Sequence, residues 1–327
     1  MNTNEYGIHT FSLKLQCKYS EIQNIIEQNE CICTGKGKLG LSPYYQMPQF
    51  KDIGVEIQLG QSVSHPCWLV LIVNPSSLFA GTYEPTALFQ ADKESVQQVK
   101  HHLRNILDKI GVDWRLREFK LSRCDLTCNL YYERKADVQD RLDIFKKSFP
   151  IPHYSAVKFG KHPNSNERFK GANKHSWTIT NKSKSCTFSA YDKTYELEKR
   201  HHIVINEHIL RLELRFGRSK IIKITKVKDW ESQLIEFGSQ VEKQQQKFLH
   251  RLHMMHFDPI PLPELLDRIN SSKYREKTKK KLRRIVKKAN GCVSLAAVRK
   301  DCRIKKSDFI KLLGKFEEMG VGCVSFE

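Results

Sequence analysis

Apolar and polar residues alternate in short runs along the first two thirds of the chain, which is the pattern of half-buried β-strands. Such runs predict strands over residues 7–17, 54–60, 67–75, 115–132, 154–160, 175–181, 186–193 and 208–216. Helical spacing predicts helices over 20–29 (with Ser20 as N-cap), 92–111, 136–149 and 194–200, and a glycine-rich loop is expected over 35–49. This order predicts an α+β domain: one mainly antiparallel sheet, covered by helices on one face.

The last third of the chain is dominated by helical patterns and basic residues. A long polar helix is expected over 229–257, and the proline-rich stretch 258–263 marks a boundary. A strongly basic helix over 273–291 follows, then two short helices with Ser294 and Ser307 as N-caps, and a terminal wing strand. This succession is typical of a helix-turn-helix or winged-helix DNA-binding unit, although a generic helical hairpin has the same pattern.

Length and charge extend this picture. The chain has 327 residues, more than one compact core usually takes. We therefore expect an α+β domain over 1–240, a helical linker over 241–260 and a basic domain over 261–327. The net charge of +20 favours a polyanionic partner, most commonly nucleic acid, over a merely solvated basic surface.

The sequence contains no pattern that indicates export or a membrane span. Its first residues lack the basic and apolar regions of a signal peptide, and the apolar run 67–73 is too short to cross a bilayer. Of its ten cysteines, none forms a C-x-x-C pair, and Cys124, Cys128 and Cys186 fall on the apolar sides of predicted strands. We expect a cytoplasmic protein with reduced core thiols and no membrane partner, and a zinc site is the alternative.

Three predicted strands have one polar face each, because successive side chains of a strand point to opposite sides of the sheet. These faces carry Arg123, Asp125, Thr127 and Asn129; Arg211, Glu213 and Arg215; and Thr187, Ser189, Tyr191 and Lys193. The strand over 54–60 adds Gln58 and Glu56, whose carboxylate is a further candidate metal ligand.

Carboxylates beside a tyrosine suggest phosphoryl chemistry. Two or three carboxylates on a sheet can hold Mg²⁺ or Mn²⁺, which polarises a scissile phosphate. A phenol can then attack the phosphorus, with a bound cation and Lys193 favouring the phenolate. The alternative is a solvated face on which Arg and Glu form cross-strand ion pairs.

Four short blocks, in order, resemble the rolling-circle replication initiators, both the replication initiation factor family of plasmids and integrative elements and the gene II/X type of filamentous phages. The resemblance covers about residues 50–220. The blocks are VNPSSLFAG (73–81), RCDLTCN (123–129), SAYDKTYEL (189–197) and LRLELRF (210–216). The resemblance implies that Tyr191 nicks one DNA strand and stays on its 5′ phosphate, that Asp125 and Glu213 bind the metal, and that Lys193 and Glu196 position DNA or metal.

The chain departs from the wider superfamily in lacking a His-hydrophobic-His strand. His250, His253 and His256 come after the blocks, at spacing that suggests a solvated or DNA-facing stripe or a zinc site. Tyr195 is the rival nucleophile, which helical phase would turn away from the sheet.

The leading interpretation is a DNA nicking and strand-transfer enzyme that initiates rolling-circle replication. Its partners would be duplex and single-stranded origin DNA, with a host helicase and polymerase and a homodimer left open. The expected DNA contacts are Arg123, Arg211, Arg215, Lys279, Lys280, Lys281, Arg283, Arg284, Lys305 and Lys306. Alternatives are a conjugative relaxase, a non-catalytic DNA-binding regulator, and an RNA-binding sheet, which would need aromatic side chains where the predicted faces carry charges.

Overall fold

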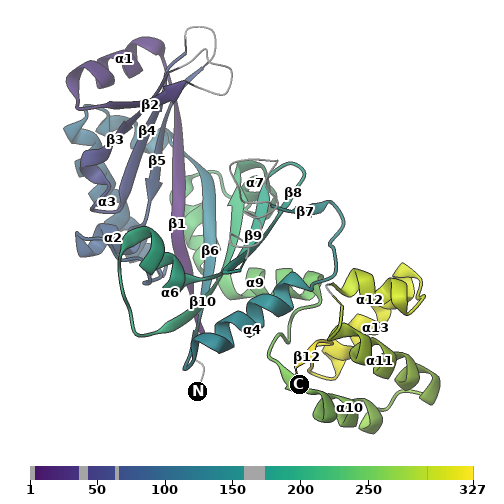
Figure 1. Ribbon diagram of the computed structural model, residues 1–327. Helices are drawn as coiled ribbons and strands as arrows, with labels where there is room; N and C mark the ends of the chain where they lie inside the picture. The colour runs from purple at the N-terminus through teal and green to yellow at the C-terminus, as the bar shows by residue number, and fades with distance from the viewer. Residues whose placement is uncertain (1–3, 37–42, 63–65, 158–173, 293, 327) are drawn as a thin grey trace.

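The computed structural model describes residues 4–36, 43–62, 66–157, 174–292 and 294–326. Its centre is an antiparallel sheet with the strand order β2-β3-β4-β5-β1-β6-β10-β9-β8-β7 (Figure 1). The strands are β1 (Asn4–Cys17), β2 (Ile32–Lys36), β3 (Pro43–Met47), β4 (Val55–Gly60), β5 (Cys67–Val73), β6 (Lys120–Tyr132), β7 (Tyr154–Ala156), β8 (Ser176–Asn181), β9 (Cys186–Asp192) and β10 (His208–Gly217).

The two halves of this sheet have the same chain order. In the first half, β1 lies in the middle of the whole sheet and α1 (Tyr19–Gln28) leads from it to the outer edge strand β2. The strands β3, β4 and β5 then return, one beside the next, until β5 pairs with β1. In the second half, β6 lies beside β1 in the middle of the whole sheet and α4 (Lys135–Lys146) leads from it to the other edge strand, β7. The strands β8, β9 and β10 then return until β10 pairs with β6. Because β1 pairs with β6, both halves form one continuous surface.

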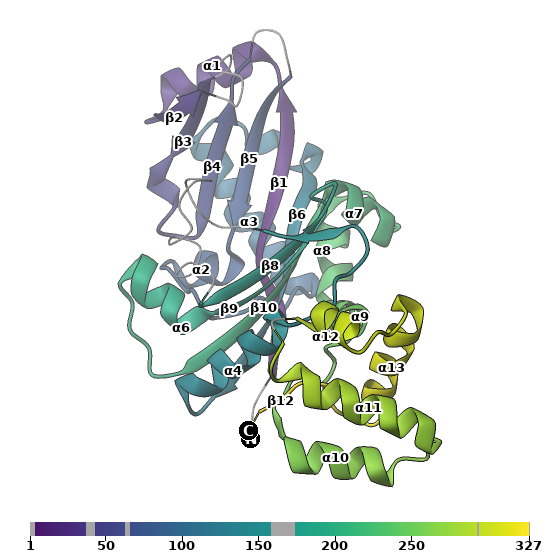
Figure 2. The same cartoon turned by 45° about the vertical axis from the view of Figure 1, so that its right-hand side comes forward.

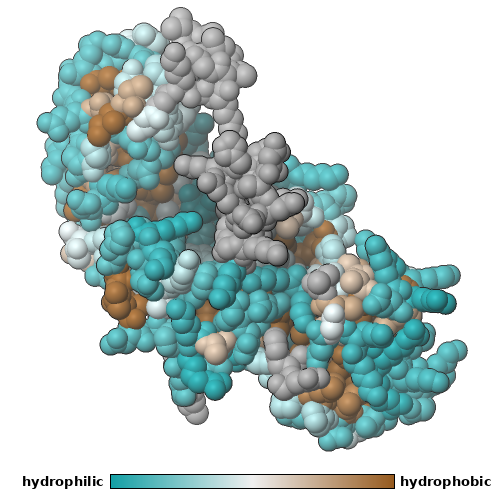
Figure 3. All heavy atoms as spheres, viewed as in Figure 1, coloured by the Kyte–Doolittle hydropathy of each residue, from teal (hydrophilic) through white to brown (hydrophobic). Residues whose placement is uncertain are grey.

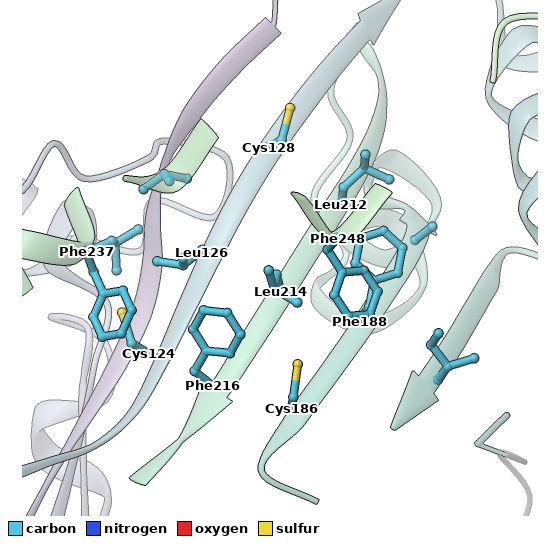
Figure 4. Close-up of a cluster of buried hydrophobic side chains, with 14 of the residues drawn as sticks. Cys124, Leu126, Cys128, Cys186, Phe188, Leu212, Leu214, Phe216, Phe237 and Phe248 are labelled. Atoms are coloured by element: carbon cyan, nitrogen blue, oxygen red, sulfur yellow. The ribbon is translucent and has the colours of Figure 1, made fainter. Parts of the chain in front are cut away.

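Helices bury one face of the sheet, as the α+β prediction requires. Cys124, Leu126, Cys128, Cys186, Phe188, Leu212, Leu214 and Phe216 line this apolar face, together with Phe237 of α8 (Trp230–Gly238) and Phe248 of α9 (Val241–Leu252) (Figure 4). The helix α3 (Lys93–Lys109) packs beside α8, and Trp230 stacks on Phe11 at 6.3 Å. The three strand cysteines are buried thiols, as predicted. The opposite side of the sheet is called the polar face below.

Three predicted elements differ in the structure. Strands β2 and β3 occupy most of the described part of the loop expected over 35–49, while residues 37–42 lie outside the described residues. The helix expected over 229–257 is two helices, α8 and α9. The first ends at Gly238, which packs so closely on Ala91 that a Cβ there would lie 2.6 Å from the Ala91 carbonyl oxygen. Residues 115–118 form a 3₁₀ turn, so the strand expected there starts at Lys120.

Helix ends were predicted with mixed success. Ser294 accepts a hydrogen bond from the Ala297 amide and caps its helix as predicted. Ser20 and Ser307 were expected to be N-caps, but both helices begin earlier. Their N-cap residues are Lys18 and Lys305, each two positions before the predicted serine. Shorter helices complete the first unit: α2 (Pro75–Ala80), α6 (Lys193–Glu196) and α7 (Arg218–Ile224). Among the described residues, no helix is both long and apolar enough to span a membrane.

The C-terminal helices form a cluster beside α4 at one end of the sheet (Figures 1 and 2). They are α10 (Leu262–Ser271), α11 (Glu276–Ala289), α12 (Leu295–Asp301) and α13 (Lys306–Glu318), with a short pair of parallel strands, β11 (Ile260–Pro261) and β12 (Ser325–Phe326). The amide of Leu295 donates to the carbonyl oxygen of Lys147 at 2.8 Å, and Phe149 packs on Phe309. The cluster is therefore docked on the sheet unit.

The segment expected as a linker, 241–260, begins with a core helix. Gln245 of α9 is buried and donates to the carbonyl oxygens of Leu126 and Leu212, at 2.8 and 3.2 Å. Phe248 stacks on Phe188 with ring centroids 4.9 Å apart. The helix α9 thus belongs to the packing of the sheet, while the division of the chain into domains stays a prediction.

Candidate active site

Tyr191 lies on the polar face near the end of β9. Its neighbours across the sheet are Arg211 of β10 and Ser176 of β8. The phenol is half-buried and lies 3.4 Å from Oε2 of Glu213, to which it donates a hydrogen bond. A cavity of about 470 Å³ opens here, and its walls include Tyr191, Glu213, Arg215, Glu196, His175 and Tyr195. The sequence blocks 189–197 and 210–216 therefore meet at this cavity.

Two carboxylates share one guanidinium beside the phenol. Nε of Arg215 lies 3.1 Å from Oδ1 of Asp125, and its Nη2 lies 2.9 Å from Oε1 of Glu213. Asp125 also accepts from Nε of Arg123, at 2.9 Å. The side chain of Asp125 is 1% exposed, whereas that of Arg215 is 42% exposed. The arrangement leaves the arginine at the surface of the site, with the acids beneath it.

The electrostatics of the site hold a proton on the phenol. Burial raises the pKa of Tyr191 well above its ordinary value, and the charge of Glu213 raises it further, while that of Arg211 lowers it. Burial also raises the pKa of Glu213, followed by the charge of Asp125. A raised pKa makes the Glu213 carboxylate a stronger base, and its contact with the phenol makes it the candidate proton acceptor at this site.

Arg211 is wholly buried, and one nitrogen of its guanidinium has no hydrogen-bond partner among the described residues. Its Nε donates to Oδ1 of Asn129 at 2.7 Å, and its Nη2 donates to the carbonyl oxygen of Thr86 at 3.0 Å. Within the described parts of the chain, its Nη1 has no hydrogen-bond partner. A buried donor without a partner costs free energy, which an anionic oxygen at this position would recover.

Lys193 and Glu196 form a buried ion pair at the edge of the site. Nζ of Lys193 lies 2.8 Å from Oε2 of Glu196, and the Lys193 side chain is 3% exposed. Burial lowers the pKa of Lys193. Glu196 also lies 3.6 Å from Arg200 and lines the cavity. Lys193 makes its ion pair to Glu196 rather than to the phenol, and the charges that shift the pKa of Tyr191 are those of Glu213, Arg211 and Glu196.

Tyr195 lies nearer to the site than helical phase predicts. It follows Asp192, whose Oδ1 caps α6 by accepting from the Tyr195 amide at 2.9 Å. Its ring stacks on His175 with centroids 3.5 Å apart, and both rings line the cavity. Two phenols therefore face this hollow, and only that of Tyr191 contacts a site carboxylate in the described structure.

Glu56 is not brought to the site. It lies on β4, and β5, β1 and β6 separate that strand from β10. Its carboxylate accepts from the amides of Gln46 and Gln58, at 3.0 and 2.6 Å. The sequence pattern placed Glu56 correctly on a strand, but alternation alone does not specify the distance between two strands of one sheet.

His9 is a member of the site that the sequence analysis missed. It lies at an irregularity in the β1–β6 register, between Ile8 and Thr10, so the simple alternation that singled out other residues does not apply to it. Burial lowers its pKa strongly, as do the charges of Arg211 and Lys193. Its Nε2 is buried without a hydrogen-bond partner among the described residues. A neutral imidazole therefore lies among the arginines.

The expected Mg²⁺ or Mn²⁺ has no ready cage in this arrangement. Among residues 4–36, 43–62, 66–157, 174–292 and 294–326, no three His, Cys, Asp or Glu side chains cluster closely enough to hold an ion. Both oxygens of Asp125 contact arginines, and those of Glu213 contact Arg215 and Tyr191. As arranged, the donor set does not fit a metal ion, and metal dependence stays a prediction.

The histidine stripe is not a helix face. The helix α9 ends at Leu252, and His253 follows with a positive φ of 55°. Nδ1 of His250 lies 3.0 Å from Oε2 of Glu317 on α13, and Nδ1 of His253 lies 3.7 Å from the same oxygen. These two histidines therefore join the sheet unit to the C-terminal helices.

The C-terminal cations predicted to bind DNA divide into two groups. Lys280, Lys281, Arg284, Lys305 and Lys306 are exposed. Lys279 and Arg283 instead contact Asn270 at the end of α10 and hold the two helices together. Figure 3 shows extended hydrophilic side chains projecting from this cluster.

The raised pKa of Glu213 predicts a pH dependence of stability. Its contribution is fully present below the pKa of the unfolded chain, about 4.3, and is lost as pH rises through the folded-state pKa. Glu213→Gln should lack this loss, so its melting temperature should fall less than that of the wild type as pH rises from about 4 to 7. Parallel melting curves for the two proteins would contradict the assignment.

Comparison with known proteins finds a distant structural likeness. No family model matches the chain, and no curated protein matches it. Among solved structures, it is similar to a rolling circle replication initiator protein from Geobacillus stearothermophilus, with a TM-score of 0.37 and 9% sequence identity. The match covers 76% of this chain and 86% of that chain.

Proposed function

We propose that this protein nicks one strand of DNA and keeps the 5′ end on Tyr191, so that rolling-circle replication can begin. One observation carries the proposal: the Tyr191 phenol lies 3.4 Å from Glu213 in a cavity that Arg215 also lines. The net charge of +20 suits a nucleic-acid substrate. Cross-strand ion pairing, the alternative, would account for the arginines and acids, but it gives no reason for the unpartnered donor of Arg211.

The proposed reaction is an in-line displacement at phosphorus. The Tyr191 oxygen attacks the scissile phosphate, a bond from phosphorus to that oxygen forms, and the bond to the 3′ oxygen breaks. The phenolic proton passes to Glu213, and the departing 3′ oxygen takes a proton from water to become a hydroxyl group. Nη1 of Arg211 and the guanidinium of Arg215 would stabilise the charge that develops on the non-bridging oxygens. Reversal at a second strand end gives strand transfer.

DNA recognition is assigned to the C-terminal helices. Lys305 and Lys306 lie at the N-terminus of α13, where the helix dipole disfavours positive charge, so an external phosphate would stabilise them there. Exposed cations of α11 add further phosphate contacts. In this scheme the basic unit binds duplex origin DNA, while the docked sheet unit receives the strand to be cut.

Removing the α11 cations should weaken duplex binding in a salt-dependent way. If Lys280, Lys281 and Arg284 each contact one phosphate, changing all three to glutamine should reduce the slope of log K against log salt by about 3. Fluorescence anisotropy with duplex DNA at several salt concentrations measures this slope. A control with Lys93, Arg104 and Lys109 of α3 changed to glutamine removes the same charge elsewhere and should change the slope far less. Equal slopes for the two variants would refute the assignment.

The deciding experiment asks for a covalent adduct. The protein is incubated with labelled single-stranded and supercoiled DNA of its replicon, with Mn²⁺ or with EDTA, and separated on a denaturing protein gel. A labelled protein band supports the nickase, and its dependence on Mn²⁺ tests the metal prediction separately. Tight binding without adduct or nick would favour the non-catalytic regulator. A conjugative relaxase would use the same chemistry, and only the identity of the origin distinguishes it.

A further inference from the structure

Two aromatic rings lie on the polar face of the first half of the sheet. Trp68 of β5 and Tyr44 of β3 have ring centroids 5.6 Å apart, and both are partly exposed. The sequence pattern predicts charges and no aromatic surface on the polar faces of the strands. It does not reveal the pair, because Tyr44 falls in the expected loop and Trp68 lies in an apolar run without alternation.

The Trp68 ring packs over a glycine. A Cβ on Gly60, directly opposite on β4, would lie 2.1 Å from Cε2 of Trp68, so the ring occupies the space of the missing side chain. Nζ of Lys14 lies 5.2 Å from the ring centroid. A ring that is already fixed loses little conformational entropy when a flat ligand stacks on it.

Positive charge beside the rings lacks a counterion. Lys14 of β1 and Lys120 of β6 are direct cross-strand neighbours, and both are exposed. Neither forms an ion pair within the described residues. Like charges opposite each other are destabilising, so a bound phosphate would relieve the repulsion.

The two rings and the candidate active site lie on the same side of the sheet. Trp68 pairs with Gln16 of β1, and Thr10 of the same strand pairs with Asp125. These positions on β1 are six residues apart, or roughly 20 Å. Ser12, which lies between them, pairs with Arg123. A flexible strand can therefore follow one face from the rings to the phenol.

We propose that Trp68 and Tyr44 stack the bases of single-stranded DNA beside the nick site, with Lys14 and Lys120 on its phosphates. The choice of DNA rests on the proposed function, whereas stacking rests on the rings themselves. Only an unpaired strand exposes base faces to such rings, since a duplex keeps them stacked internally. Gln46 and Gln58, which bracket Glu56, offer hydrogen-bonding groups to base edges nearby.

Binding to an oligo(dT) of about 12 nucleotides tests the proposal without any need for nicking, metal or origin sequence. By fluorescence anisotropy with the full chain, Trp68→Ala should weaken binding about tenfold, and Trp68→Phe, which keeps a stacking ring, should restore most of it. Tyr19→Ala removes an exposed aromatic residue that lies on the helix α1 and not on the sheet, and it should have no effect. Duplex binding should be unchanged in all three variants.

Other binding results would contradict the stacking proposal or the choice of single-stranded DNA. Equal affinities for the wild type and Trp68→Ala, or a Phe variant as weak as the Ala variant, would overturn stacking. A parallel loss of duplex binding would show that the surface does not select single strands, and tighter binding of oligo(rU) would overturn the assignment to DNA. Melting temperatures establish that each variant is folded. A Tyr191 adduct with normal Trp68→Ala binding would defeat this inference alone, and the reverse result would defeat the nicking proposal alone.

Discussion

Tyr191→Phe should abolish the covalent protein–DNA adduct and lower nicking by at least about 10³-fold. The change removes one oxygen, which is the atom proposed to attack phosphorus, and keeps the ring. The hydrogen bond that the phenol donates to Glu213 is long, at 3.4 Å, so its loss should change the free energy of unfolding by less than about 1 kcal/mol. Nicking and adduct formation on labelled single-stranded DNA, with a melting curve for each protein, measure both effects.

Tyr195→Phe is the matched control, because Tyr195 lines the same cavity. Its ring stacks on His175, and phenylalanine preserves this stacking. We expect this variant to keep its adduct and most of its nicking rate. If the adduct persists in Tyr191→Phe and disappears in Tyr195→Phe, the nucleophile has been assigned to the wrong tyrosine. If both variants nick normally, the cavity is not a nickase site.

Much of the candidate active site could be predicted from the sequence, because Asp125, Glu213 and Tyr191 lie on regular strands. Alternation placed Asp125, Glu213 and Tyr191 on one face, and the register brings their strands together: Arg215 pairs with Asp125, and Arg211 with Tyr191. Strand order was not readable, since hydrophobic patterning gives the faces of a strand but not its neighbours. For this reason Glu56 appeared to be a fourth ligand and is three intervening strands away.

The remaining site residues were missed where the chain leaves regular patterns. His9 lies at a register irregularity, and Thr86, which accepts from Arg211, lies on a connection between helices. Trp68 requires the absence of a side chain on Gly60, which is a relation between two strands that no single-strand pattern contains. The internal repetition of topology was hidden for the same reason: it lies in the order of strands, and the two halves carry different residues on their polar faces.

The arginine–carboxylate network makes a further prediction, in which Asp125→Ala lowers the free energy of unfolding by about 2–3 kcal/mol. Removing this carboxylate leaves Arg123 and Arg215 without their shared partner at the buried end of the network. The loss should be smaller than the 3–5 kcal/mol typical of a fully buried pair, because the two arginines are 28% and 42% exposed. Urea denaturation measures it directly.

Glu264→Ala provides the comparison, since Glu264 pairs with Arg268 on the surface of α10, where the two side chains are 50% and 45% exposed. Such a surface pair should contribute no more than about 1 kcal/mol. If Asp125→Ala is no more destabilising than Glu264→Ala, the buried network does not stabilise the fold, and the acid would be retained for chemistry alone. If it is destabilising as predicted, Asp125→Asn becomes the informative variant for catalysis. It keeps the shape and an acceptor oxygen for Arg215, so a loss of nicking in a folded Asp125→Asn protein would report the missing charge rather than a collapsed sheet.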